Sequence, residues 1–440
     1  MKGMIEEEAM SETYYANALV NSDPRLLRLK EYLVHAVSPE MQNQSTQKQP
    51  DRESVRRLLL DAYARTRADL KPEVRDSIID SALADLIGYG PIELLLPDPD
   101  ISEIMVNGAS HVFVERNGEI LETDVHFEDD NHLLRIIDRI VSPMGRHVDS
   151  DNPTADARLP DGSRVNIVIP PVAVDGPHVT IRKFLQTKMT MDDLVSMNAL
   201  TIHMAKFLEA CVATRLNILV TGNTSSGKTT VLNALSGYIP DKERIVTIED
   251  AVELKLKQRH VVRLETKLPN VDGSGAVGVR ELVRNALRMR PDRIVVGEVR
   301  GGEAMDMLQA MNTGHTGSLT TLHANSPRDG TSRLETMSMM AGLDIPLLAI
   351  RKQIAAAINL IVHLSRLSDG SRKMTHITEL SGMEGDVITL TDIFKFEQTG
   401  ISPDGKIIGQ LRPTNMRPLF TPRLEAAGYK LGGEIFGAGL

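Results

Sequence analysis

Residues 221–230, Thr-Gly-Asn-Thr-Ser-Ser-Gly-Lys-Thr-Thr, constrain the fold of this chain more than any other segment. The largely apolar run 216–220 predicts a buried strand before them, and the run 231–235 predicts the start of a helix after them. A strand, a glycine-bounded loop, a lysine, a hydroxyl and a helix in this order form a phosphate-binding P-loop. The sequence therefore predicts an α/β domain that binds a nucleotide.

The chemistry of this loop gives each of its residues an expected task. Backbone N–H groups and the positive end of the helix should surround an anion. Lys228 should reach the β- and γ-phosphates of ATP, and the Thr229 hydroxyl should bind Mg²⁺. Gly222 and Gly227 allow backbone angles and close approaches that a Cβ atom would obstruct. The other expected nucleotide contacts are Thr224, Ser225, Ser226 and Thr230.

Length and charge limit what else the chain can be. Its 440 residues are enough for two or three domains, and a net charge of −9 argues against a general nucleic-acid binder. The longest apolar runs, 167–174 and 355–364, are too short to span a bilayer, and the acidic N-terminus is unlike a secretory signal. We expect a cytoplasmic protein without a nucleic-acid partner, which associates with membranes only through other proteins.

The rare residue types also restrict the chemistry. Cys211 is the only cysteine, so disulfides and cysteine-rich zinc sites are excluded by count. It lies in an apolar helical stretch, 207–212, and is expected in the core. With no tryptophan and 3% aromatic residues, the cores must be aliphatic, with methionines as fillers.

Composition and periodicity divide the chain into segments. Apolar residues at helical spacing predict a short helix at 26–37 and two more at 51–70 and 72–86. Strand and helix patterns alternate after them, and arginines gather near the end of the first α/β stretch. The predicted order is an acidic, mobile N-terminus (1–22), a short helix with a polar linker at 39–50 (23–50), a helical segment (51–90), an α/β domain (91–184), a hinge (185–190) and a P-loop α/β domain (191–440).

Three segments after the loop carry side chains that could complete a site for phosphate chemistry. In 244–253 an apolar strand ends in Glu249, Asp250 and Glu253, and ligands of parallel α/β sheets bind at such strand ends. Glu249 and Glu253 could hold water molecules that are bound to Mg²⁺. An exposed acidic turn would give the same pattern, so this segment alone leaves both interpretations open.

The second segment, 291–300, is an apolar strand that delivers Glu298 to its end. Gly297 stands where a generic P-loop enzyme carries an aspartate that holds the magnesium shell. Glu298 is therefore the candidate general base, which would orient or deprotonate the attacking water, and it could also reach the metal through water.

The third segment, 313–325, is rich in glycine and threonine and contains His315 and His323. A lone histidine is more often structural, but two in a segment of small residues could donate to the γ-phosphate or its surroundings. A zinc site would need a third ligand at suitable spacing, and the sequence offers no strong one.

Together with the P-loop, these segments resemble the secretion ATPase superfamily, and most closely the tight-adherence (Tad/Flp) pilus ATPases of the CpaF type. The resemblance covers roughly residues 51–400 and makes the glycine at 297 a family trait. A Cys₄ zinc module, present in many type II secretion members, is not possible here, and no Asn-Lys-x-Asp guanine signature occurs, which favours ATP over GTP. The further motifs that carry the resemblance are GYGPIE at 88–93, IMVNG at 104–108, TADARLPDGSRV at 154–165 and RNALRMRPDR at 284–293.

The resemblance implies a fold class, which is α/β with a RecA-like P-loop C-terminal domain, a smaller PAS-like α/β domain before it and an N-terminal helical segment. It also implies a homo-hexamer on the cytoplasmic face of the inner membrane, with ATP between the two domains and domain closure driving inner-membrane platform proteins. Arg158, Arg164 and Arg182 lie in stretches that match family arginines, which reach the phosphates on closure. A guanidinium can stabilise charge on the γ-phosphate, although a basic surface that balances an acidic partner domain would also explain these arginines.

We therefore expect a Mg²⁺-dependent ATPase that powers assembly, with or without retraction, of a Tad/Flp-type pilus. Three alternatives stay open. They are a type II or type IV secretion ATPase that exports protein or DNA, a RecA-like nucleic-acid translocase, and a non-catalytic scaffold in which nucleotide only gates assembly. The acidic net charge counts against the translocase, and the complete set of catalytic segments counts against the scaffold.

Overall fold

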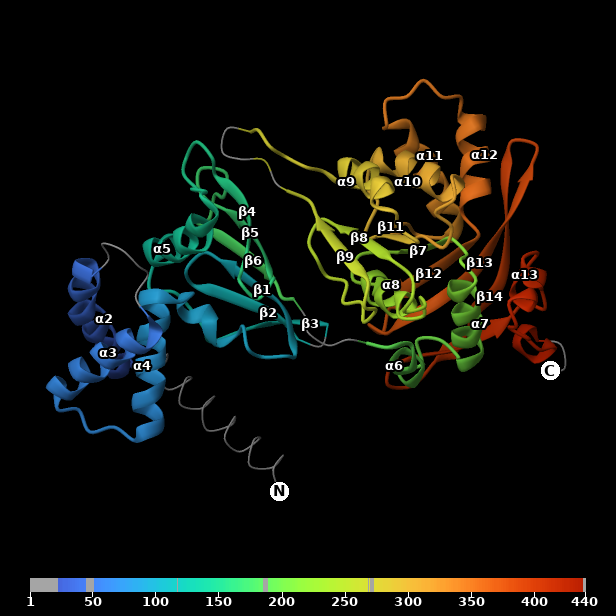
Figure 1. The fold of residues 1–440 in the computed structure, drawn as a ribbon. Helices are drawn as coiled ribbons and strands as arrows, with labels where there is room; N and C mark the ends of the chain where they lie inside the picture. The colour runs from blue at the N-terminus through green and yellow to red at the C-terminus, as the bar shows by residue number, and fades with distance from the viewer. Residues whose placement is uncertain are drawn as a thin grey trace. The chain divides into compact units, whose positions relative to one another are not determined.

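The chain folds as two units, with the boundary between Gln186 and Thr187. The structure is a computed structural model that describes residues 23–44, 51–116, 118–184, 189–267, 269 and 273–437. The predicted mobile N-terminus, 1–22, and most of the predicted hinge, at 185–188, lie outside the described residues, so both stay predictions. Figure 1 shows the elements of each unit.

The first unit begins with a bundle of helices, drawn in blue in Figure 1: α2 (Pro24–Gln44), α3 (Arg52–Thr66) and α4 (Pro72–Ile87). Each helix contributes an apolar face to one shared core, in which Leu33, Leu59 and Ile78 are fully buried. Each such burial contributes about 1.5–3 kcal/mol, and neither α3 nor α4 has a side-chain N-cap, so the core holds the bundle together. The helix predicted at 72–86 is confirmed, whereas the one predicted at 51–70 is confirmed for 52–66 and ends at Thr66.

Helix α2 is longer than predicted. The sequence predicts a helix at 26–37 and a polar linker at 39–50, but α2 continues through Pro39 to Gln44. A proline inside a helix removes one backbone hydrogen bond and costs about 3 kcal/mol. Burial offsets this cost, because Val37 is buried before the proline and Met41 packs on the same core after it. The linker prediction is therefore wrong for 39–44, while 45–50 lie outside the described residues.

The rest of the first unit is a six-stranded antiparallel sheet with the order β3-β2-β1-β6-β5-β4. Its strands are β1 (Ile101–Asn107), β2 (His111–Arg116), β3 (Glu119–Glu122), β4 (Thr154–Arg158), β5 (Arg164–Val168) and β6 (His178–Arg182). Helix α5 (Asp130–Val141) covers one face, and its Leu133 and Ile136 share a core with Val165 and Ile167 of β5. Because side chains alternate along a strand, Arg164 is left on the opposite face.

The second unit is built on a nine-stranded sheet with the order β15-β14-β13-β12-β7-β11-β10-β8-β9. The strands are β7 (Ile218–Gly222), β8 (Ile245–Glu249), β9 (Val261–Glu265), β10 (Arg293–Val296), β11 (Leu319–His323), β12 (Leu360–Arg366), β13 (Arg372–Glu384), β14 (Val387–Ile401) and β15 (Ile407–Pro413). All pairs from β12 through β9 in that order are parallel, and β7 lies between β12 and β11. The P-loop strand is therefore inside a parallel sheet, and the predicted α/β fold class is confirmed.

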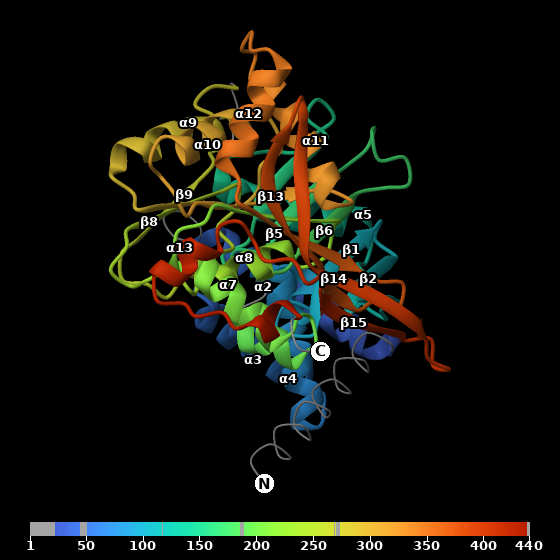
Figure 2. The ribbon, with the colours of Figure 1, turned by 90° about the vertical axis from the view of Figure 1, so that its right-hand side faces the viewer.

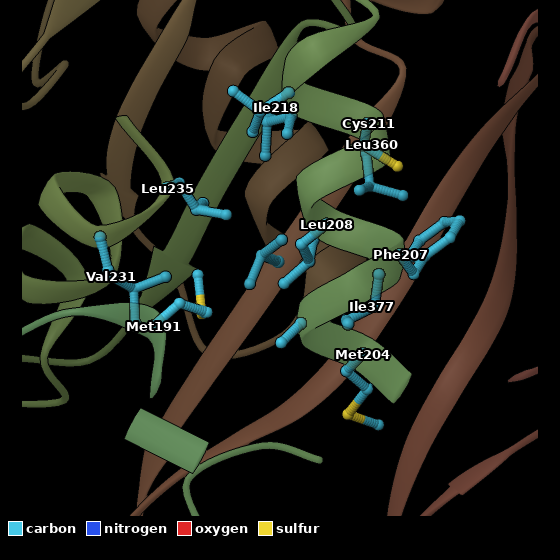
Figure 3. Close-up of a cluster of buried hydrophobic side chains, with 14 of the residues drawn as sticks. Met191, Met204, Phe207, Leu208, Cys211, Ile218, Val231, Leu235, Leu360 and Ile377 are labelled. Carbon is cyan, nitrogen blue, oxygen red and sulfur yellow. The ribbon is translucent and has the colours of Figure 1, made fainter. Parts of the chain in front are cut away.

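Helices cover both faces of this sheet. The helices are α6 (Met191–Ser196), α7 (Ile202–Ala213), α8 (Lys228–Ser236), α9 (Val279–Ala286), α10 (Glu303–Asn312), α11 (Pro327–Met339), α12 (Leu347–Ala357) and α13 (Thr421–Ala426). Residues of α7 and α8 share one core, and residues of α9 to α12 share another. Figure 3 shows Phe207, Leu208 and Cys211 of α7 in the first core, with Ile218 of β7 and Leu360 of β12. Cys211 is buried as predicted, and burial raises the pKa of its thiol well above the ordinary value.

Antiparallel strands extend the sheet beyond β12. Figure 2 shows β13 and β14 as a long paired ribbon in orange and red, and β15 pairs with the far edge of β14. A tight turn at 367–371 joins β12 to β13. None of the described helices is long and apolar enough to cross a membrane.

Candidate active site

The loop between β7 and α8 has the geometry of an anion-binding loop. Gly222 ends β7, and a Cβ atom there would lie 2.5 Å from the carbonyl oxygen of Leu364. Gly227 precedes α8 with φ of +95°, a left-handed conformation that favours glycine. No side chain caps α8, so the N–H groups of its first turn remain available to an anion at the positive end of the helix dipole.

The hydroxyl residues of the loop differ in burial. Ser226 is buried, and its Oγ has no hydrogen-bond partner among the described residues. A buried hydroxyl without a partner is costly, so Ser226 fits a loop whose ligand accepts hydrogen bonds. Thr224 is exposed, and Ser225, Thr229 and Thr230 are half-buried. Thr229 lies in the first turn of α8, where a hydroxyl ligand for Mg²⁺ is expected.

Lys228 folds back over the loop. Its Nζ donates a 3.0 Å hydrogen bond to the carbonyl oxygen of Asn223 and lies 3.4 Å from Nδ1 of His323. The residue is 8% exposed, so its ammonium group is largely withdrawn from water. It adds a positive charge beside the loop amides, where the outer phosphates of a nucleotide are expected.

Glu298 lies between His323 and Arg300. Its Oε1 is 2.8 Å from Nε2 of His323, and its Oε2 accepts a 2.6 Å hydrogen bond from Nη2 of Arg300. Arg300 also lies 3.6 Å from Oδ2 of Asp250. Lys228, His323, Glu298, Arg300 and Asp250 therefore form one connected series, which we call the charge chain. It follows the carboxyl ends of β7, β11, β10 and β8, which lie at the same edge because these strands are parallel.

Burial lowers the pKa of His323, and the Lys228 ammonium lowers it further, although the Glu298 charge acts in the opposite direction. The ring is therefore neutral at pH 7 and carries one N–H group. Nδ1 of His323 accepts from Lys228, while Nε2 lies 2.8 Å from Oε1 of Glu298, a buried oxygen that accepts no hydrogen bond within the described part of the chain. His323 thus connects the lysine of the P-loop to the candidate base without adding a charge between them.

Glu249 occupies the space that a side chain at position 297 would need. A Cβ atom on Gly297 would lie 3.0 Å from Cγ of Glu249. The Glu249 carboxylate is buried, and its Oε2 accepts hydrogen bonds of 2.7 and 2.9 Å from the N–H groups of Glu253 and Leu254. Glu249 therefore positions the turn that carries Glu253, a task that the sequence did not predict.

Glu253 follows the same turn and is half-buried. A hydrogen bond with Glu298 raises the pKa of Arg300, and the negative charges of Asp250 and Glu253 raise it further. The acidic segment after β8 and the strand end after β10 therefore converge on one guanidinium. This arrangement argues against a simple exposed acidic turn.

His315 lies far from the loop within its own unit. It precedes β11, whereas His323 ends β11 opposite Gly222 of β7. Nδ1 of His315 is 3.4 Å from the carbonyl oxygen of Pro291, and its own carbonyl oxygen accepts a hydrogen bond from Ser318. Both contacts are at the amino ends of the parallel strands. This position does not fit the prediction that His315 contacts the γ-phosphate of the same subunit.

The three predicted arginines lie side by side in the first unit. Arg158 of β4 pairs with Arg164 of β5, and Arg164 pairs with Arg182 of β6. Residues directly opposite in antiparallel strands share a face of the sheet, so these side chains form an arginine row on the face away from α5. Glu103 of β1 lies opposite Arg182 and continues the row with the opposite charge. The sequence predicted the residues but not their alignment.

The structure also adds residues that sequence reasoning missed. Arg300 could have been predicted as a site residue, because it follows Glu298 by two positions. His363 carried no sequence signal. Its Nδ1 is 2.9 Å from Oγ1 of Thr221, at the base of the loop, and it also hydrogen-bonds the backbone of Asn325, just beyond His323. Burial lowers the pKa of His363 to about 4, so the ring is neutral and supports this connection.

The site has no protein cage for a metal ion. Among the described residues, no group of three His, Cys, Asp or Glu side chains could hold one. A hydroxyl such as Thr229, with a nucleotide's own phosphates and water, suits Mg²⁺, which keeps several waters and binds few protein groups. The residues present therefore fit Mg²⁺ that arrives with a nucleotide.

Several known proteins are similar to the chain over most of their own length. A Mycobacterium tuberculosis protein named for conjugal transfer is 37% identical over 313 residues, which cover 70% of this chain and 88% of that protein. The conjugal transfer protein TrbB of Rhizobium radiobacter is 32% identical and covers 66% of this chain and 86% of its own length. The type IV secretion system protein VirB11 of Bartonella henselae is also 32% identical and covers 65% of this chain and 90% of its own length.

Two solved structures align with about two thirds of the chain. The VirB11 ATPase of Brucella suis, solved with sulphate, is 30% identical with a TM-score of 0.37, over 66% of this chain and 95% of that one. The Legionella pneumophila ATPase DotB is 23% identical with a TM-score of 0.47, over 64% of this chain and 79% of that one. The profile of one protein family, described as "Type II/IV secretion system protein", matches residues 85–398. That match runs from the end of α4 into β14 and includes the P-loop, the charge chain and the arginine row, and the chain therefore belongs to the type II/IV secretion system protein family.

Proposed function

We propose that the chain is a Mg²⁺-dependent ATPase, which hydrolyses ATP to ADP and phosphate and couples the reaction to mechanical work. The charge chain carries this proposal. It connects the phosphate-binding lysine to a carboxylate through a single neutral histidine. A P-loop that only bound nucleotide would have no need for a carboxylate held in this way at the neighbouring strand end.

Each residue of the site then has a definite task. Lys228 and the loop N–H groups hold the phosphates, and the Thr229 hydroxyl holds Mg²⁺. When bound, Mg²⁺ neutralises charge on the phosphate oxygens. Glu298 orients the attacking water and accepts its proton, while a hydrogen bond from Arg300 holds one carboxylate oxygen and His323 lies 2.8 Å from the other. His323 also senses the γ-phosphate, because it contacts Lys228 directly.

The arginine row supplies the remaining positive charge in this proposal. Guanidinium groups stabilise the charge that develops on the transferred phosphoryl group. Arg158, Arg164 and Arg182 share one face and one end of their sheet, so a phosphate chain could contact more than one of them. The subunits form a homo-hexamer in this proposal, as the family resemblance implies.

The proposal also includes the larger assembly that this ATPase drives. The motifs that resemble Tad/Flp ATPases favour assembly of a Tad/Flp-type pilus, and its retraction where that occurs, through inner-membrane platform proteins. A second candidate is a secretion or conjugation ATPase. It is favoured by the names of the relatives, which refer to conjugal transfer and type IV secretion.

Purified full-length chain tests the enzymatic part. We expect steady release of phosphate from ATP that requires Mg²⁺, and loss of nucleotide binding in Lys228→Ala. The partner machine is tested in the source cell by complementing a deletion with wild-type or Lys228→Ala chain. Loss of surface pili alone would support the pilus proposal, whereas intact pili with loss of DNA transfer or protein export would support the second candidate.

A further inference from the structure

The turn between β12 and β13 places an arginine directly on the P-loop. Arg372, the first residue of β13, donates a 2.9 Å hydrogen bond from Nε to the carbonyl oxygen of Ser225. Its side chain also passes over the start of α8, since a Cβ atom on Gly227 would lie 3.9 Å from Cδ of Arg372. The arginine and the loop belong to the same unit of the same chain.

The end of this side chain is available to a ligand. Arg372 is exposed, and only its Nε has a hydrogen-bond partner among the described residues. The terminal Nη1 and Nη2 groups therefore retain their donors next to a loop that is built to bind an anion. Guanidinium groups bind phosphate through such paired donors.

The turn that carries Arg372 is held in place by Asp369. The Oδ1 atom of Asp369 accepts hydrogen bonds from the N–H and the hydroxyl of Ser371, at 2.9 and 2.6 Å. Its Oδ2 accepts a 2.8 Å hydrogen bond from the N–H of Ile407 in β15. These bonds, the Ser371 hydroxyl foremost, lower the pKa of Asp369 to about 2, so the support persists at neutral pH. The antiparallel extension of the sheet thus braces the turn beside the P-loop.

The loop residue that Arg372 contacts has an unusual backbone. Ser225 has φ of +57°, in the left-handed region that non-glycine residues seldom adopt. Its peptide carbonyl accepts the hydrogen bond from Arg372 and so is directed out of the loop interior. The N–H of the same peptide belongs to Ser226 and donates a 3.3 Å hydrogen bond to the carbonyl oxygen of Asn223, so both ends of this peptide hold the loop in its conformation.

We propose that Arg372 contacts the phosphates of the nucleotide bound by the P-loop of its own chain. This inference rests on the proposed function and extends its binding site. Arg372 differs from the arginine row, because it lies in the same unit as Lys228 and needs no movement of the other unit to reach the loop. It should therefore contribute to the binding of ADP as well as ATP.

The test measures nucleotide affinity of the full-length chain by titration calorimetry. A charged hydrogen bond corresponds to a loss of about tenfold to a hundredfold when removed, so Arg372→Gln should weaken ATP, ADP and inorganic tripolyphosphate by that factor. Arg372→Lys should retain part of the affinity, because it keeps the charge. Asp369→Ala should weaken binding by a smaller factor, since it frees the turn but leaves the arginine.

The controls separate this inference from the proposed function. Arg412→Ala, another exposed arginine of the same sheet, should bind nucleotide like the wild type. Wild-type affinity for all three ligands in Arg372→Gln, together with lost binding in Lys228→Ala, would reject the Arg372 contact and keep the proposed function. Equal losses in Arg372→Gln and Arg372→Lys, with an equal drop in the unfolding midpoint of the nucleotide-free chain, would also reject it, because Arg372 would then only brace the loop. Lack of nucleotide binding by the wild-type chain would reject the proposed function itself.

Discussion

Both carboxylate oxygens of Glu298 lie within 2.8 Å of a neighbouring side chain, and the shorter of the two contacts is the 2.6 Å hydrogen bond from Arg300. A base that is held in this way is positioned before water arrives, which lowers the entropy cost of the reaction.

Replacing this carboxylate tests the chemical step. We expect Glu298→Gln to bind ATP with near wild-type affinity and to hydrolyse it about 10²- to 10⁴-fold more slowly, because the amide cannot accept the proton of water. Single-turnover phosphate release and equilibrium ATP binding measure the two properties separately. Glu384→Gln, at an exposed glutamate, should hydrolyse ATP at the wild-type rate. Near-normal turnover in Glu298→Gln would remove Glu298 from its assigned task.

The contact between Gly297 and Glu249 predicts a coupling between two substitutions. Gly297→Asp should displace Glu249 from the N–H groups of Glu253 and Leu254 and destabilise the chain by roughly 1–3 kcal/mol, the usual range for overpacking. Truncating the Glu249 side chain should reduce the loss of stability that Gly297→Asp causes. The double variant Gly297→Asp/Glu249→Ala should therefore be more stable than the sum of the single changes predicts. Urea unfolding of the four proteins gives the coupling energy, and strict additivity would contradict the steric explanation.

The pH dependence of stability should report on His363. Its pKa is about 4 in the folded chain and about 6.5 when unfolded, so the unfolded state binds more protons between these values. The contribution of His363 is therefore complete above about pH 6.5 and is lost as the pH falls toward 4. We expect protonation of His363 in the unfolded state to lower the free energy of unfolding by about 2 kcal/mol when the pH falls from 7 to 5.

Comparing His363→Gln with the wild type isolates this effect. The difference in free energy of unfolding between the two proteins should shrink by about that amount from pH 7 to pH 5. His203→Gln, at an exposed histidine, should follow the wild-type curve. A constant difference between wild type and His363→Gln would show that His363 does not bind a proton on unfolding.

The local chemistry of the P-loop was readable from sequence, whereas its neighbours depended on strand order. Gly222 and Lys228 lie within one short segment, so their spacing alone predicts the loop. His363 contacts Thr221 only because β12 pairs with β7, and no local sequence pattern predicts that pairing. The sequence segment 313–325 contains the whole of strand β11. His315 therefore lies before the amino end of the strand and His323 lies at its carboxyl end, next to the P-loop.

The extent of α2 was missed for a related reason. Local helix propensity predicts that the helix ends near Pro39. The packing of Met41 on the core of the bundle depends on tertiary structure and could not be predicted from the local sequence. The position of Glu249 likewise depends on the glycine of another strand. Tertiary contacts of this kind decide the details that sequence periodicity leaves open.

A buried ion pair at the amino ends of the strands should govern the stability of the second unit. Arg293 is fully buried, with Nε 2.5 Å from Oε2 of Glu243 and Nη1 donating to the carbonyl oxygen of Gly317. Arg293→Ala would leave Glu243 buried with reduced compensation, which costs roughly 3–5 kcal/mol. Lys406→Ala, which removes the exposed pair with Asp404, should cost less than about 1 kcal/mol. Chemical denaturation compares the two, and similar losses would contradict the importance of burial.

The arginine row predicts a change in turnover without a matching change in affinity. Because these side chains lie in the unit that does not contain the P-loop, we expect Arg158→Ala, Arg164→Ala and Arg182→Ala to lower the rate of ATP hydrolysis more than they weaken ATP binding. An arginine that stabilises the phosphoryl group in the transition state is worth about 10³- to 10⁵-fold in rate, so the residue that contacts it should show the largest loss. Arg57→Ala, at an exposed arginine of α3, should hydrolyse ATP normally. Normal turnover in all three row variants would leave the row as a basic surface, and the positive charge at the transition state would then have to come from Lys228 and Arg372 of the P-loop unit.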